Sequence, residues 1–266
     1  MSTTDILSLG EDRLFLFFMS FLLCLARTIG FFVQAPIWGS NHINKQVKVG
    51  LSAGVAIVIF PYIPIPDALP GGPFTFILLV ASQITVGLVI GFVAFIPMAM
   101  AQFGGELMDI QMGLSSAAAN DPSSKGTINL IRRLKFYIAM IVYLILNGHH
   151  VLLDAIARSF EIVPLTGVRF SSILITELIR ITSELLYVGV QIGLPVLGAL
   201  FMIQIALGIM AKVAPQMNVF MLSFPLNILM GLTILVSSIP LFVARLKPLF
   251  SRNFNDVVTA IRMIVP

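Results

Sequence analysis

Five apolar runs, each long enough to cross a lipid bilayer, constrain this sequence more than any other feature. They are Leu14–Trp38, Val47–Ile65, Phe74–Phe103, Leu185–Ala211 and Val219–Ala244. A helix needs about 20 apolar residues to cross the hydrocarbon core, and in lipid only helices and closed barrels satisfy every backbone polar group. Runs of this length favour helices. The sequence therefore predicts an all-α, polytopic membrane protein of kinked helices and helical hairpins.

Composition supports a membrane protein. Charged residues make up 11% of the 266 residues and hydrophobic residues 58%, whereas a soluble domain carries roughly 25% charged residues. The basic residues are not interleaved with aromatic ones, which argues against nucleic-acid binding. The single cysteine, Cys24, lies in an apolar run and has no partner for an internal disulfide. The acidic N-terminus lacks a basic n-region, so no cleaved signal peptide is expected.

A sixth apolar region, Phe136–Val163, is interrupted by the polar group Asn147-Gly148-His149-His150. The arms on either side, Phe136–Leu146 and Val151–Val163, are each too short to span a bilayer. Because Asn-Gly is a turn signal, two short arms around it predict a helical hairpin that returns to its starting face.

The distribution of basic residues supports that hairpin. If the sixth region crossed straight and the N-terminus lay outside, the Lys and Arg residues of the loops would divide evenly between the two sides. With a hairpin, thirteen of the sixteen fall inside, and only Arg13, Arg27 and Lys212 do not. The positive-inside rule therefore predicts an outside N-terminus and a cytoplasmic C-terminus. We expect one membrane-embedded domain over residues 1–266, with a cytoplasmic tail at about 245–266.

Prolines and glycine pairs occur within the apolar runs. Each proline removes a backbone donor and is expected to kink or end a helix; these are Pro97, Pro195, Pro225 and Pro240. Glycines four residues apart allow helices to approach closely, and the candidate packing glycines are Gly50, Gly54, Gly87, Gly91, Gly189 and Gly193.

The segment Gly104–Pro122 reads GGELMDIQMGLSSAAANDP and follows the third apolar run. It combines three glycines and two acids with Leu and Met side chains, which an ordinary polar loop lacks. At membrane depth, irregular backbone is tolerated only when protein buries it or a cavity hydrates it. The segment is therefore a candidate pore element.

Several polar residues have more than one interpretation. Glu106 and Asp109 are either ion ligands or residues that cap turns and face water at a pore mouth. Arg27 is either a functional intramembrane charge or a side chain that snorkels or pairs with a neighbour. His149 and His150 lack the further ligands of a metal site and are expected to form a polar turn. No nucleotide-binding pattern occurs, so no cofactor is expected.

A second motif, KVAPQMNVFMLSFPLNILMG, occupies Lys212–Gly231, and Asn-Gly-His-His lies between it and Gly104–Pro122. In this order, the two motifs make the chain resemble the FliR/SpaR family. Members of this family are membrane subunits of type III protein-export gates. The resemblance covers nearly the whole chain and implies a gate subunit of the flagellar branch, in the bacterial inner membrane within the flagellar basal body. It also implies P- and Q-type gate subunits and a B-type switch subunit as partners, with unfolded rod, hook and filament proteins as substrates.

The same resemblance implies that the loop of the first motif plugs the gate pore. The residues Ile110–Ala117 match the plug most directly. The full set of candidate plug residues is Gly104, Gly105, Glu106, Met108, Asp109, Ile110, Gln111, Met112, Gly113, Leu114, Ser115, Ser116, Ala117, Asp121 and Pro122.

The hypothesis is therefore a non-enzymatic export-gate subunit. Two alternatives stay open at this point: a small-solute secondary transporter of the inner membrane, and an intramembrane enzyme. The serine-protease version of the latter fails, because Ser116 stands where that family needs a glycine after the serine.

Overall fold

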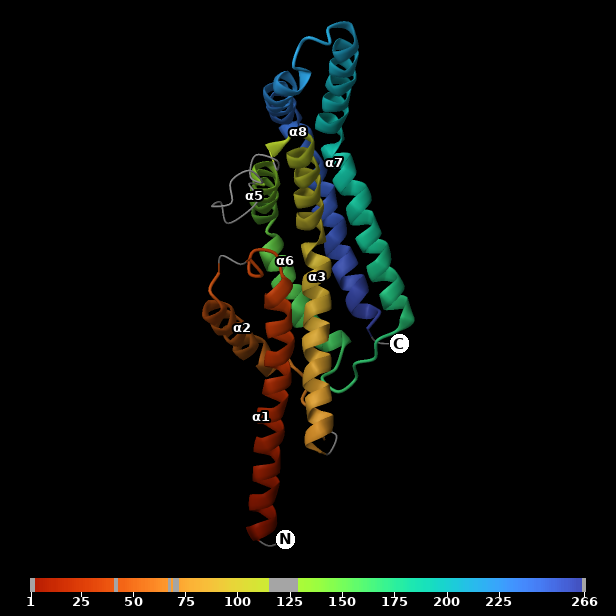
Figure 1. Cartoon of the computed structure of the whole chain (residues 1–266). Helices are drawn as coiled ribbons and strands as arrows, with labels where there is room; N and C mark the ends of the chain where they lie inside the picture. Colours follow the sequence, from red (N-terminus) through yellow and green to blue (C-terminus); the bar gives the residue numbers. More distant parts are fainter. Residues whose placement is uncertain (1–2, 41–42, 67, 69–71, 115–128, 265–266) are drawn as a thin grey trace. The chain divides into compact units, whose positions relative to one another are not determined.

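The computed structural model describes residues 3–40, 43–66, 68, 72–114 and 129–264, and these residues form helices and no strand. The α-helices are α1 (Thr3–Gln34), α2 (Lys45–Ile59), α3 (Pro73–Gln111), α5 (Leu130–Ile145), α6 (Gly148–Ile162), α7 (Ser172–Val213) and α8 (Val219–Arg262) (Figure 1). A short 3-10 helix, η1 (Phe60–Tyr62), follows α2. The all-α fold predicted from the apolar runs is confirmed.

Four of these helices contain segments long and apolar enough to cross a membrane. The segments are Arg13–Gln34, Pro73–Gln111, Ser172–Val213 and Met221–Arg262. Helices α5 and α6 are separated by a short break at which Asn147 adopts a left-handed conformation, with φ of 54°. Asn tolerates that conformation better than most residues. The break falls where the sequence predicted it, and the number of candidate spans becomes five if the pair counts as one. The return of the chain to its starting face stays a prediction.

The second predicted span is corrected by the structure. Val47–Ile65 is not one long helix, because α2 has 15 residues and ends at Ile59, where Phe60 and Pro61 begin η1. At 1.5 Å per residue, α2 is about 22 Å long and falls short of the roughly 30 Å hydrocarbon core. Its start is fixed locally, since the Asn44 side chain accepts a hydrogen bond from the Gln46 amide at 3.2 Å.

The predicted tail is helical, and its cytoplasmic location stays a prediction; the predicted prolines lie within helices and do not end them. Residues 245–262 continue α8 as helix, and Leu246, Phe250 and Val257 on this stretch are buried. The helices also continue through their prolines, which are Pro97 in α3, Pro195 in α7, and Pro225, Pro240 and Pro248 in α8. A long helix tolerates an internal proline when another group satisfies the freed carbonyl.

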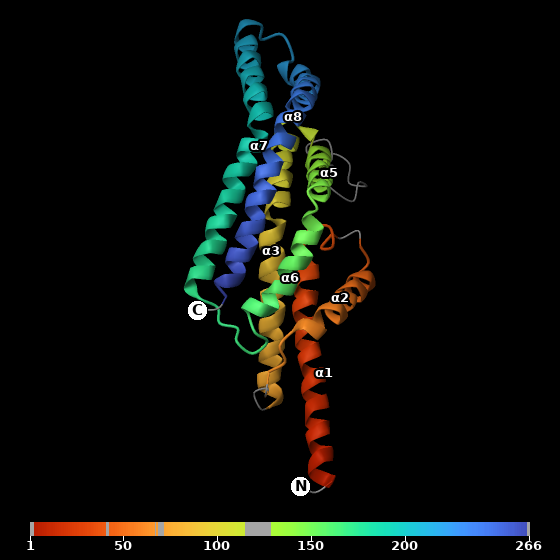
Figure 2. The same ribbon diagram turned by 180° about the vertical axis from the view of Figure 1, so that it is seen from behind.

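The chain divides into two compact units. The first unit comprises Met1–Phe95, Asn147–Arg180 and Arg252–Pro266. Within it, α1 lies beside the N-terminal part of α3, and α2 lies against α1 (Figures 1 and 2). Its core contains Leu23, Cys24, Ala56, Phe60, Ile63, Phe160 and Leu165. Cys24 is buried there as a small apolar side chain, as the sequence predicted.

The second unit comprises Ile96–Leu146 and Ile181–Ser251. It holds the C-terminal part of α3, helix α5, and most of α7 and α8, which lie side by side in both views (Figures 1 and 2). Its core contains Met108, Met112, Ile131, Val196, Leu200 and Leu235. Both motifs that support the family resemblance lie in this unit.

Candidate functional site

The first motif is helical over much of its length, which corrects the expectation of a loop over the whole of Gly104–Pro122. Gly104–Gln111 form the last two turns of α3, and the chain leaves the helix at Met112 and Gly113. Gly113 has φ of 79°, a conformation that favours glycine. The remaining candidates, Ser115, Ser116, Ala117, Asp121 and Pro122, lie outside the described residues.

Met108 and Met112 form the centre of this site. Met108 lies in the last turn of α3 and Met112 directly follows the helix, with its amide bonded to the Met108 carbonyl at 2.9 Å. Both are fully buried, and they pack with Ile131 of α5, Val196 and Leu200 of α7 and Leu235 of α8. We call this set the methionine cluster. By contrast, Ile110 points away from it, with 58% of its surface exposed. The flexible thioether side chains fill the irregular space where four helices meet.

The two sequence motifs meet at this cluster. A Cβ atom added to Gly231, the last residue of the second motif, would lie 2.7 Å from Cγ and 2.9 Å from Sδ of Met112. A Cβ atom on Gly113 would lie 3.2 Å from the ring of Phe224, also in the second motif. Nearly 120 residues separate Met112 from Gly231, and the absence of a side chain at Gly231 leaves room for Met112.

Asp109 caps a helix that is distant in sequence. Its carboxylate accepts hydrogen bonds from the backbone amides of Ile131 at 3.0 Å and Arg132 at 2.9 Å, in the first turn of α5. The side chain is fully buried. The capping interpretation of this residue therefore matches the geometry, whereas the expectation that it faces water at a pore mouth is wrong.

Glu106 lies one turn earlier on the same face of α3. Its carboxylate is 3.6 Å from the Arg132 guanidinium, and both side chains are about 40% exposed. The same guanidinium donates to Gln102 at 3.2 Å. Both carboxylates therefore interact with the first turn of α5. No group of three or more metal-binding side chains occurs in the described part of the chain.

The glycine pairs differ in their surroundings. Gly87 and Gly91 of α3 lie directly against the backbone of α1 at Arg27 and Phe31. In the second unit, a Cβ on Gly104 would lie 2.8 Å from the carbonyl oxygen of Gly189, one of the predicted packing glycines.

The remaining glycines make fewer contacts. A Cβ atom on Gly193 would lie 3.4 Å from the carbonyl oxygen of Gly104. On α2, a Cβ atom on Gly50 or Gly54 would meet no atom within 4 Å. That glycine pair therefore packs against no other element in the described part of the chain.

Arg27 is fully buried in the first unit and does not snorkel. Its Nε donates to the Gln83 side chain at 2.7 Å, and its terminal nitrogens donate to the carbonyls of Ser159 at 2.8 Å and Val163 at 2.9 Å. The guanidinium also lies 4.1 Å from the centre of the Phe160 ring. Ser159 and Val163 are at the C-terminal end of α6, where the helix dipole favours a cation. Arg27 thus joins α1, α3 and α6.

Sequence reasoning missed two buried polar residues. Lys135 is fully buried on α5, with its ammonium 3.9 Å from the centre of the Phe242 ring on α8. Asn253 donates to the carbonyl of Val93 at 2.7 Å. Pro97 signals a free carbonyl at Val93, but nothing local to Asn253 indicates that it is the donor.

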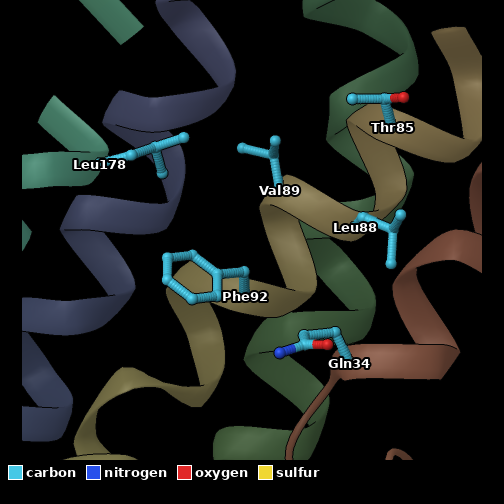
Figure 3. Close-up of a pocket in the computed structure, with 6 residues that line it drawn as sticks. All are labelled: Gln34, Thr85, Leu88, Val89, Phe92 and Leu178. Carbon is cyan, nitrogen blue, oxygen red and sulfur yellow. The ribbon is translucent and has the colours of Figure 1, made fainter. Parts of the chain in front are cut away.

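An apolar groove in the first unit is lined by Gln34, Thr85, Leu88, Val89, Phe92 and Leu178 (Figure 3). The Thr85 hydroxyl donates to Ala81 of its own helix. A ligand site usually contains several converging polar groups, and this groove does not, so it is not the functional site.

Comparison with known proteins places the chain in a family. The family described as bacterial export proteins, family 1, matches residues 18–253. The chain belongs to this family. This export protein is 29% identical over 243 residues to the flagellar biosynthetic protein FliR of Escherichia coli K12, covering 90% of this chain and 93% of that relative. It is 30% identical over 250 residues to the FliR protein of Bacillus subtilis 168, covering 93% and 96%. It is 22% identical over 240 residues to the FliR protein of Aquifex aeolicus.

Proposed function

We propose that this export protein is a subunit of the flagellar type III export gate, where it helps to form and seal the channel for unfolded flagellar proteins. Its family membership and its end-to-end similarity to flagellar biosynthetic proteins support this role. The role is not enzymatic and requires no cofactor. The substrates would be rod, hook and filament subunits.

The observation that supports the sealing role best is the methionine cluster. Met108 and Met112 close the space between α3, α5, α7 and α8 with side chains that bind no ion. A gate must stay tight to ions while it rests and must yield when a chain passes. Thioether side chains suit both demands, because they pack without voids and change rotamer easily.

The plug would comprise the end of α3 and the residues that follow it. Of the described candidates, Ile110 is the exposed apolar side chain, so it is available to a passing chain or a partner subunit. Gly113 and Leu114 then begin the connection toward α5. The candidates from Ser115 to Pro122 lie outside the described residues and remain part of the proposal on the strength of the sequence motif alone.

Partners would cover much of the apolar surface. The adjoining ends of α7 and α8 expose large apolar side chains, including Ile205, Ile209, Val213, Met217 and Met221. We propose that the P- and Q-type gate subunits pack on such surfaces, with a B-type switch subunit joining the assembly in the flagellar basal body. The solute-transporter alternative loses support, because Glu106 and Asp109 both interact with α5.

Deletion of the gene tests the proposal directly. We expect loss of motility, with flagellin retained inside the cell. The wild-type gene should restore motility and flagellin export. Normal motility combined with a nutrient-uptake defect would instead favour the transporter.

The seal needs a second measurement. Met108→Ser with Met112→Ser should let ions leak through assembled gates, seen as membrane depolarisation. Met202→Ser is the matched control, since Met202 is exposed and is not among the side chains assigned to the partner surface.

A further inference from the structure

Helix α5 lacks a cap of its own. The first amides of any α-helix have no partner within the helix and need one from elsewhere. Asn129 occupies the N-cap position of α5, but its side chain makes no capping hydrogen bond, and its ψ of 72° is unusual for a cap. The amides of Ile131 and Arg132, at the second and third helical positions, are those that a capping side chain normally satisfies.

Asp109 supplies this cap from a different helix. One carboxylate oxygen accepts from Ile131 and the other from Arg132, so both amides are satisfied by a single side chain more than 20 residues away. A carboxylate is also the group that the positive end of a helix dipole favours. Because Asp109 is fully buried, water cannot replace it without entering the core.

Gly105 makes the second contact between α3 and the N-terminus of α5. We call Gly105 and Asp109 together the α5 contact site. Gly105 lies one helical turn before Asp109 on the same face of α3. A Cβ atom there would lie 2.7 Å from Cα of Arg132 and 2.9 Å from the carbonyl oxygen of Ile131. The first turn of α5 therefore packs directly against the backbone of Gly105, while Asp109 caps its N-terminus. Any side chain at Gly105 would displace the first turn of α5.

The α5 contact site and the methionine cluster are linked through two residues. Ile131 receives the first capping hydrogen bond and is itself a member of the cluster. Met108, the neighbour of Asp109, is another member. Displacement of the α5 terminus would therefore withdraw Ile131 from Met108 and Met112.

We propose that Asp109 is a positioning residue of the export gate: its carboxylate, with Gly105, fixes the first turn of α5 so that Ile131 closes the methionine cluster. The inference rests on the proposed sealing function. It assigns Asp109 a role through α5 and not through any contact with the exported chain.

The test uses complete gates with all their subunits, in membrane vesicles with equal amounts of assembled complex. Asp109→Asn keeps the size of the side chain but removes its charge and replaces one of the two acceptor oxygens with a donor, so one of the two α5 amides loses its acceptor. We expect ion leak through these gates to rise about tenfold over wild type, because the hydrogen bonds that hold the first turn of α5 are weakened. Amide hydrogen exchange at Ile131 and Arg132 should accelerate by a similar factor.

Gly105→Ala provides an independent variant that removes no charge. It should raise the leak in the same direction, and it keeps the inference testable if Asp109→Asn fails to assemble. Asp154→Asn, at an exposed ion pair with Arg158, is the control and should leave the leak unchanged. Glu106→Gln tests whether the loss of a negative charge alone causes the leak. It removes a carboxylate from the same face of α3 but leaves the Asp109 cap of α5 unchanged.

Two results would overturn the inference. One is that Asp109→Asn and Gly105→Ala gates remain as tight as wild type, with unchanged amide exchange, in cells that export normally. The other is that Glu106→Gln gates leak as much as Asp109→Asn gates. Normal export in the gene-deletion strain would instead refute the proposed function itself.

Discussion

The side-chain amide of Asn253 donates a hydrogen bond of 2.7 Å to the backbone carbonyl of Val93. This is the carbonyl that Pro97 leaves without a helical partner, because Pro97 has no N–H and follows Val93 by four residues. Asn253 is almost fully buried. The C-terminal part of α8 therefore compensates for the proline in α3.

Replacing Asn253 with alanine should expose this dependence. The Val93 carbonyl would be left buried and unsatisfied, at a cost of about 1–3 kcal/mol in the free energy of unfolding. Thermal denaturation of the purified gate complex measures the loss. In a Pro97→Ala background, a helical N–H can bond to Val93, so Asn253→Ala should cost much less. An equal loss in both backgrounds would show that Asn253 acts through another contact.

The contact between Met112 and Gly231 predicts a compensating pair. Gly231→Ala forces Met112 to move, since the added Cβ would lie 2.7 Å from Cγ. Met112→Ala removes packing and should cost about 2–5 kcal/mol. The double variant should be more stable than the sum of the two losses indicates, with coupling of roughly 0.5–3 kcal/mol. Strict additivity in thermal unfolding would contradict the contact.

Arg27 should tolerate no ordinary substitution. Arg27→Met leaves Gln83 and the carbonyls of Ser159 and Val163 without their donor, which should destabilise the protein by about 3 kcal/mol. Arg27→Lys should recover only part of this, because an ammonium lacks the guanidinium fork. The yield of folded protein in detergent reports both effects. Arg158→Ala is the control, as Arg158 is exposed, and a yield for Arg27→Met equal to that of this control would refute the role.

The membrane orientation is testable with reporter fusions. A reporter after Pro266 should be active in the cytoplasm, because thirteen of the sixteen basic residues fall inside in the hairpin topology. A reporter between Asp67 and Pro73 should lie in the periplasm. Because α2 is too short to cross, a reporter after Ser40 should also lie in the periplasm, and this result would move the N-terminus, expected outside from the sequence, to the cytoplasm. A periplasmic signal from the C-terminal fusion would restore the straight crossing.

The apolar sequence by itself determined the long helices. In α1, α3, α7 and α8, apolar residues run for the length of a bilayer, and a helix is the structure that satisfies such a backbone internally. The break at Asn147-Gly148 was equally local, since an Asn in a left-handed conformation ends a helix without a distant partner. The length of α2 could not be predicted from the sequence, because the apolar run continues through Pro61 beyond the end of the helix.

Only the tertiary structure decided what the residues of the first motif do. Gly104 and Gly105 looked like loop glycines, yet each lies in a helix where a neighbouring helix rests on its backbone. Asp109 looked like an exposed acid, yet it is buried because the amides it satisfies belong to α5. In the same way, Asn253 has no local signal, since its partner is 160 residues away. Local sequence records which backbone groups lack partners, and packing determines which distant side chains supply them.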